Sequence, residues 1–319
     1  MDYTAAISFF EPDEPYLLAT HVNADCDGIG GLLALREMLV RKERVCRLVL
    51  SDETLNPKFA FLPGFEHIEL YRSLSDRPSF DRAVFVDTPT LDPQRVGDVC
   101  RLLGEHASTM IIDHHTVRKP EGGVRIVDSA ASSASELVYG LLLAAEAEIE
   151  PEVANQIYAG IAFDTKLFRV SHPERALKVC SELVDFGADP EAIADALFAR
   201  ESLETMVTLA AALGTLDLHC DGRVNTVVVD HETYRKGGDP DPVVDHAMAI
   251  DGVQVAVVLK EEAPGRFRVS LRSRGGVDVN RVAVAFGGGG HRRASGCRIA
   301  KPVEEAKRLL LAEVEKQLN

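Results

Sequence analysis

The N-terminal part of the chain alternates short apolar runs with longer segments of helical periodicity. The apolar runs cover residues 16–21, 45–50, 82–87 and 108–113, and an amphipathic helix is expected over about 29–42. They lack a strict alternation of polar and apolar residues, which is typical of strands that are covered on both faces. Strands that alternate with helices predict a parallel sheet with crossover helices. We therefore expect an α/β fold in which helices flank a parallel sheet.

The pattern changes twice further along the chain. It becomes helical from about residue 132, with helices expected over 133–147, 151–163, 173–187 and 190–198. After residue 220 it is rich in β-type runs, at 224–230, 253–260 and 266–272, and a helix is expected over 278–286. We expect a first domain over residues 1–188, a helical linker over 189–205, and a smaller α+β domain over 206–319.

Composition narrows the class of protein. Hydrophobic residues at 46% and charged residues at 27% fit a folded globular chain. The formal charge of -15 argues against electrostatic binding along a nucleic-acid duplex, so we expect no long-duplex binding. The six cysteines form no Cys-x-x-Cys pair, and no stretch approaches the roughly 20 apolar residues of a membrane span. A cytoplasmic protein with no membrane partner is the expectation.

Acidic and histidine residues gather where the apolar runs end. Three runs end in His21, Asp87 and Asp113, and the residues that follow the first and last runs include Asp25, Asp27, His114 and His115. The carboxyl ends of parallel strands meet at one edge of a sheet, so these side chains should converge. Carboxylate oxygens and imidazole nitrogens bind divalent metal ions. Taken singly, each residue could instead be a helix cap or an exposed turn residue.

A run of glycines near the C-terminus is a second candidate site. Gly287–Gly290 precede His291, and glycine lets the backbone approach a ligand and offer N–H groups to an anion. Arg272 and Ser273 end a β-type run, and arginine can bind phosphate through two parallel hydrogen bonds. The alternative is a tight turn between the helix over 278–286 and a following strand.

These segments resemble the motifs of the DHH phosphoesterase superfamily. The four motifs of its DHH domain are similar to His21–Gly28, Val86–Thr88, Asp113–His115 and Gly160–Thr165. The segment Gly287–Gly296 resembles the DHHA1 domain signature. Size and motif order are most similar to the NrnA-like subgroup, which degrades very short RNA (nanoRNase activity) and dephosphorylates adenosine 3′,5′-bisphosphate (pAp). The chain has Ala24 and Cys26 where the family commonly has Pro and Gly.

The resemblance implies a two-metal hydrolase. It implies one Mn²⁺ held by His21, Asp25 and Asp87, and a second held by Asp27, Asp87, His114 and Asp164, with Mg²⁺ or Co²⁺ as alternatives. Two such ions lower the pKa of a shared water and neutralise charge on a phosphate. His115 is then expected on the substrate side, with Asp113 orienting the pair. The implied substrate contacts are Arg272, Ser273, Gly288, Gly289, Gly290 and His291.

The resemblance also implies an activity. We expect hydrolysis of short oligoribonucleotides (nanoRNA) to nucleoside 5′-monophosphates and of pAp to AMP. The expected partners are short RNA or DNA oligonucleotides, nucleotides such as pAp, and a second copy of the chain in a homodimer. The alternatives are a cyclic or linear dinucleotide phosphodiesterase such as a pApA hydrolase, a RecJ-like exonuclease, and a catalytically silent nucleotide-binding protein. Aromatic residues at 6% leave little material for stacking a long single strand, which disfavours the exonuclease.

Overall fold

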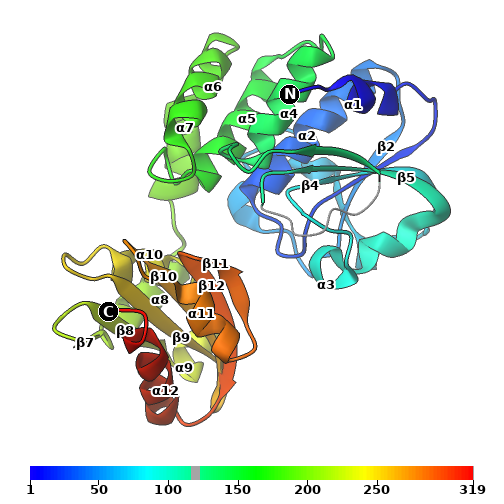
Figure 1. The fold of residues 1–319 in the computed structure, drawn as a ribbon. Helices are drawn as coiled ribbons and strands as arrows, with labels where there is room; N and C mark the ends of the chain where they lie inside the picture. The colour runs from blue at the N-terminus through cyan, green and yellow to red at the C-terminus, as the bar shows by residue number, and fades with distance from the viewer. Residues whose placement is uncertain (116–122, 319) are drawn as a thin grey trace. The chain divides into compact units, whose positions relative to one another are not determined.

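The computed structural model describes residues 1–115 and 123–318. The chain divides into two compact units, Met1–Arg200 and Glu201–Asn319, and each contains a six-stranded sheet with helices around it (Figure 1). The α/β class expected from the sequence is therefore confirmed. No helix among the described residues is both long enough and apolar enough to cross a membrane.

The sheet of the first unit is entirely parallel. Its strand order is β3-β2-β1-β4-β5-β6, so the chain builds outward from β1 to β3 and then returns to the other side of β1. The strands are β1 (Tyr16–Ala19), β2 (Cys46–Leu50), β3 (Ile68–Leu70), β4 (Phe80–Val86), β5 (Leu103–Asp113) and β6 (Val124–Val127). The strand order reverses between β1 and β4, and in such sheets the crevice beyond that point is where ligands bind.

Two apolar cores cover the two faces of this sheet. Leu18 contributes to the core formed with α1 (Thr4–Phe9), α2 (Cys26–Arg41), α4 (Ala134–Ala144), α5 (Pro151–Asp164) and α6 (Pro173–Asp185). Its neighbours Leu17 and Ala19 contribute to the opposite core, with α3 (Pro93–Val96) and the 3-10 helix Gly97–Leu102. Successive side chains of a strand point to opposite faces, so burial on both faces explains the unbroken apolar runs.

Helix α2 begins earlier than the sequence pattern predicts, at Cys26 instead of residue 29. Asp25 is its N-cap: the carboxylate accepts from the backbone N–H groups of Asp27 at 3.0 Å and Gly28 at 3.2 Å. An N-cap carboxylate satisfies donors that have no partner within the helix. Asp25 therefore stands at the start of α2, and Asp27 lies in its first turn.

The second unit has a mixed sheet. Its strand order is β11-β12-β10-β9-β8-β7, and only β8 and β9 run parallel. The strands are β7 (Asp217–His219), β8 (Val224–Val229), β9 (Val255–Ala263), β10 (Arg266–Ser273), β11 (Gly289–His291) and β12 (Ala294–Ala300). One core includes residues of α11 (Val279–Ala285) and α12 (Val303–Glu315). The other includes residues of α8 (Leu203–Leu213) and α10 (Pro242–Met248), while α9 (His231–Arg235) packs beside β9.

The boundary between the two units along the chain falls within the segment that the sequence pattern assigns to a helical linker. Helix α7 (Pro190–Ala194) continues as a π-helix over Asp195–Ala199. The backbone is extended at Arg200 and Ser202, and the Ser202 hydroxyl then caps α8 by accepting from the Thr205 N–H group. The helical part of this segment is thus interrupted at the division between the units.

Candidate metal site

Ends of strands β1, β4 and β5 bring the predicted ligands together at the switch point of the first sheet. Three groups have side-chain ligand atoms within 4.8 Å of one another. They are His21 with Asp25 and Asp87, Asp27 with His114 and Asp164, and Asp87 with His114 and His115. Asp87 and His114 each belong to two groups, so the groups form one continuous cluster.

Asp87 lies at the centre of this cluster. Its side chain is almost fully buried, with Oδ2 3.1 Å from His21 Nε2. The other oxygen, Oδ1, is 3.6 Å from His114 Nε2 and 3.5 Å from His115 Nδ1. Its backbone is left-handed, with φ of 56°, and its N–H donates to the Ile112 carbonyl at 2.8 Å. A non-glycine residue in this region is uncommon, and such conformations concentrate at functional sites.

Hydrogen bonds orient two of the histidines. His21 Nδ1 lies 2.8 Å from the Val22 carbonyl oxygen, which can only accept, so Nδ1 carries a proton. In the neutral ring Nε2 then has a free lone pair facing the cluster. His115 Nδ1 lies 2.8 Å from Oδ1 of the fully buried Asp113, which fixes the orientation of that ring. Asp113 thus contacts the cluster through His115.

Asp27 is held by the first turn of α4. Its Oδ2 accepts from the Ala134 N–H group at 2.7 Å, and its Oδ1 accepts from the Ser135 N–H group at 2.8 Å. The Ser135 hydroxyl also donates to the Asp27 carbonyl at 3.0 Å. A helix N-terminus favours negative charge, so α4 stabilises the ionised carboxylate. Gly160 permits this arrangement, because a Cβ there would lie 2.1 Å from the Ser135 hydroxyl oxygen.

Within the described part of the chain, the buried carboxylates of the cluster lack enough positive partners to balance their charge. Burial, and then the neighbouring carboxylates of Asp25 and Asp27, raise the pKa of Asp87 well above its ordinary value. Burial also raises the pKa of Asp164 and of Asp27. The buried oxygens Asp87 Oδ1, Asp113 Oδ2 and Asp164 Oδ2 have no hydrogen-bond partner among the described residues. Unpaired buried carboxylate oxygens are costly, and divalent metal ions would compensate them. The donor set therefore fits a metal centre.

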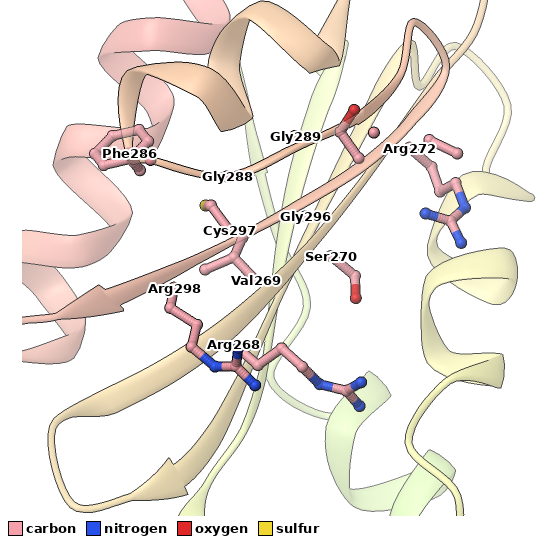
Figure 2. Close-up of a pocket in the computed structure, with 14 residues that line it drawn as sticks. Arg268, Val269, Ser270, Arg272, Phe286, Gly288, Gly289, Gly296, Cys297 and Arg298 are labelled. Carbon is pink, nitrogen blue, oxygen red and sulfur yellow. The ribbon is translucent and has the colours of Figure 1, made fainter. Parts of the chain in front are cut away.

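The second unit contains a groove of about 560 Å³ at the glycine-rich strand β11 (Figure 2). Arg272 lines it, and so do Gly288, Gly289 and Gly290. Ser273 is not part of its lining, because the buried Ser273 hydroxyl donates to the Val277 carbonyl at 2.9 Å. The backbone of His291, the last residue of β11, pairs with that of Ala294 in β12. The side chain of His291 lies outside the described part of the structure.

Each of the two units matches the model of a known protein family. The model described as "DHH family, N-terminal domain" matches residues 16–161, and the model described as "DHHA1 domain" matches residues 224–319. Together they cover most of the chain. The chain therefore contains a DHH family N-terminal domain followed by a DHHA1 domain. The resemblance inferred from the motifs is thereby confirmed, and the groove lies in the DHHA1 domain.

Several known proteins are similar to this DHH protein along most of their length. The "Bifunctional oligoribonuclease and PAP phosphatase NrnA" of Thermus thermophilus is 29% identical, with 96% of this chain and 90% of the relative aligned. The protein of the same name from Bacillus subtilis is 28% identical, with 92% of each chain aligned. The crystal structure of an exopolyphosphatase-related protein from Bacteroides fragilis has a TM-score of 0.88 at 26% identity, covering 97% of this chain and 94% of that one. The manganese-bound exonuclease RecJ, at 14% identity and a TM-score of 0.54, shares the fold.

Asp52 also supports the DHH site, although the sequence pattern did not single it out. Asp52 follows β2, and its Oδ1 accepts from the Ala24 N–H group at 3.1 Å. It thereby supports the loop between His21 and Asp25, and its own burial raises the pKa of its carboxyl. The strand-end argument that singled out His21 and Asp87 applies equally to β2, so the signal was present. The role of Ser135 as a donor to Asp27 had no comparable signal, since 108 residues separate them.

Proposed function

We propose that this protein is a two-metal phosphoesterase that hydrolyses short oligoribonucleotides to nucleoside 5′-monophosphates and pAp to AMP. The observation that carries the proposal is a pair of adjacent ligand groups, each with two carboxylates and one imidazole. One is His21 with Asp25 and Asp87, the other is Asp27 with His114 and Asp164, and Asp87 lies close to His114. The names of the Thermus and Bacillus relatives support the choice of substrates, because the alignments span nearly the whole of each protein. Free thiols at all six cysteines are compatible with the cytoplasm as its location.

The proposed ligand sets are those that the family resemblance implies, and the clustering of these side chains supports them. His21, Asp25 and Asp87 would hold one ion, and Asp27, Asp87, His114 and Asp164 would hold the other, with Asp87 common to both sets. The mixed imidazole and carboxylate set favours Mn²⁺ over Mg²⁺, which prefers oxygen ligands. Two such ions, when bound, activate a water and neutralise charge on the phosphate.

The remaining residues act on the substrate. His115 is partly exposed and is held by Asp113, so it is placed to donate a hydrogen bond to the phosphate that is attacked. Arg272 and the glycine N–H groups of β11 bind another phosphate of the same substrate. In this proposal the DHH domain cleaves the ester and the DHHA1 domain selects the nucleotide.

The test is an assay of the purified protein with Mn²⁺ on pAp, pApA and a five-residue RNA. We expect hydrolysis of pAp and RNA, two metal ions per chain by elemental analysis, and a loss of kcat of at least about 10²-fold in Asp87→Ala. Asp98→Ala is the matched control, because Asp98 is an exposed aspartate paired with Arg101. Hydrolysis of pApA alone would favour a dinucleotide phosphodiesterase. No turnover together with fewer than two ions per chain would contradict the proposal.

A further inference from the structure

The outer face of strand β10 carries a row of polar side chains. Arg268, Ser270 and Arg272 alternate along β10 with Val269 and Leu271, which lie in the core with α11 and α12. On β12 they are paired with three residues that share their face, Arg298, Gly296 and Ala294 respectively. The groove thus has two ends, one formed by Arg268 with Arg298 and the other by Arg272 (Figure 2). The proposed function uses only the Arg272 end.

Small residues separate the two ends. Ser270 pairs with Gly296, which in turn pairs with Gly289 on β11. A Cβ at Gly288 would lie 2.1 Å from the Gly296 carbonyl oxygen, and one at Gly290 would lie 2.6 Å from that of Ala294, so the fold itself requires those two glycines. A Cβ at Gly289 would meet only Asn280 Oδ1, at 4.0 Å. The fold does not require glycine at position 289, so its bare, exposed backbone is available to a ligand.

The two arginines of the other end share one acidic partner, Glu262. Glu262, at a bulge of β9, lies 3.5 Å from Arg268 Nε through Oε1 and 3.4 Å from Arg298 Nε through Oε2. Arg268 also donates from Nη2 to Asp241 at 3.2 Å. The terminal nitrogens of Arg298 contact no polar group among the described residues, and its side chain is 76% exposed. Glu262 therefore orients the Arg298 guanidinium through a hydrogen bond and forms a longer ion pair with Arg268, and it leaves the Nη atoms of Arg298 available.

The local charge is positive in an acidic chain. The buried Lys260 lies beside Arg268 on β9 and pairs with Asp241. Four cations, Lys260, Arg268, Arg272 and Arg298, therefore lie near three carboxylates, Asp239, Asp241 and Glu262, and one positive charge remains in excess. The whole chain carries a formal charge of -15. A local surplus of positive charge in a groove attracts anions.

We propose that Arg268 and Arg298 form a second phosphate subsite of the DHHA1 groove, which binds a phosphate further along the oligonucleotide that Arg272 holds. This inference rests on the proposed function for the identity of the ligand. Arg268 and Arg272 lie four residues apart on β10, about 13 Å from a rise of ~3.3 Å per residue. That separation leaves room for a nucleoside between a phosphate at Arg272 and a phosphate at Arg268. The proposed function assigns one phosphate of pAp to the metal site and the other to Arg272, so pAp has no third phosphate for the second subsite.

The subsite is tested with Arg298→Gln and with the double variant Arg268→Gln/Arg298→Gln. The control is Arg281→Gln, because the Arg281 side chain is 74% exposed and is likewise paired with a single acid, Asp278. For a five-residue RNA we expect KM to rise about tenfold in the double variant, since charge-assisted hydrogen bonds to phosphate are lost. For pAp we expect KM to stay within about twofold of wild type, and Arg281→Gln should change neither value.

A binding measurement separates failure of the subsite from failure of the proposed function. Anisotropy of a labelled five-residue RNA, with metal chelated, needs no turnover. In Arg298→Gln the slope of log K against log salt should fall by about 0.7, the value for one phosphate contact on a single strand. An unchanged slope and an unchanged KM for RNA would overturn the subsite. So would equal losses for pAp and RNA, which indicate a structural role. If the wild type hydrolysed no substrate but Arg298→Gln still lowered the slope, the proposed activity would be refuted and the subsite would stand.

Discussion

Asp87 is buried among other acids, and this predicts how pH affects the metal-free protein. Its pKa is raised well above its ordinary value of 3.8, first by burial and then by Asp25 and Asp27. A raised folded-state pKa stabilises the fold below the unfolded pKa, and this contribution is lost as pH rises through the folded pKa. In chelator, Asp87→Asn should therefore gain Tm relative to wild type between about pH 4 and pH 8. Differential scanning fluorimetry measures the difference, and a constant difference across this range would contradict the prediction.

Asp52 is a positioning residue whose loss should weaken metal binding without unfolding the protein. Its carboxylate holds the loop between His21 and Asp25 through the Ala24 N–H group, and it is not a member of the three ligand groups. Removal of a partner that orients metal ligands typically costs 10- to 100-fold in metal affinity or activity. We expect a loss in that range for Asp52→Ala, measured by titration with Mn²⁺. Asp98→Ala is again the control, and full affinity in Asp52→Ala would refute the role.

At the scale of single residues, the sequence indicated which acids and histidines lie together better than it indicated the groups that support them. His21, Asp87 and Asp113 stood out because each ends an apolar run, and parallel strand ends converge. Their supports are backbone N–H groups and distant side chains, such as the Ser135 N–H group that binds Asp27. Such contacts depend on how α4 packs against α2, which no local pattern encodes. The sequence also did not indicate that the Ser273 hydroxyl donates to the Val277 carbonyl, although only four residues separate them.

At the scale of elements, the close approach of α2 and α5 predicts a large effect for a small substitution. A Cβ at Gly30 would lie 2.4 Å from the Gln156 carbonyl oxygen of α5, so Gly30→Ala must push the two helices apart. Overpacking of this kind costs about 1–3 kcal/mol in the free energy of unfolding. Urea denaturation measures the loss. The control is Gly276→Ala, where an added Cβ meets no atom within 4 Å, and equal stability of the two variants would contradict the prediction.

Element boundaries were predicted less well than element types, for identifiable reasons. Helix α2 starts three residues before the predicted start because Asp25 caps it, a role that the metal-ligand interpretation of Asp25 obscured. Strands β3 and β6 were not predicted. They have only three and four residues and lie at the edges of the sheet, so they carry too few apolar positions to give a pattern.

At the scale of the whole molecule, the change of pattern along the chain predicted two structural units. Four of the six strands in the first unit, β1, β2, β4 and β5, correspond to the apolar runs. Three of the six in the second unit, β8, β9 and β10, correspond to the β-type runs after residue 220. The boundary was less clear in the sequence, because the pattern predicts a helical linker over 189–205, which spans α7, the following π-helix and the start of α8. The extended backbone at Arg200 and Ser202 interrupts that stretch and has no strong composition signal.

The division into units predicts that metal stabilises only part of the molecule. All three ligand groups lie within Met1–Arg200, so Mn²⁺ at 100 times its dissociation constant should stabilise that unit by about 2.7 kcal/mol. For a unit of this size the gain corresponds to a rise in Tm of roughly 5–10 °C. Scanning calorimetry should resolve two transitions, with Mn²⁺ moving one and leaving the other in place. In Asp87→Ala most of the Mn²⁺-induced rise in Tm should be lost, because this variant lacks the carboxylate that lies beside both His21 and His114. If Mn²⁺ moved both transitions equally, either the units would unfold together or the ions would bind outside the predicted site.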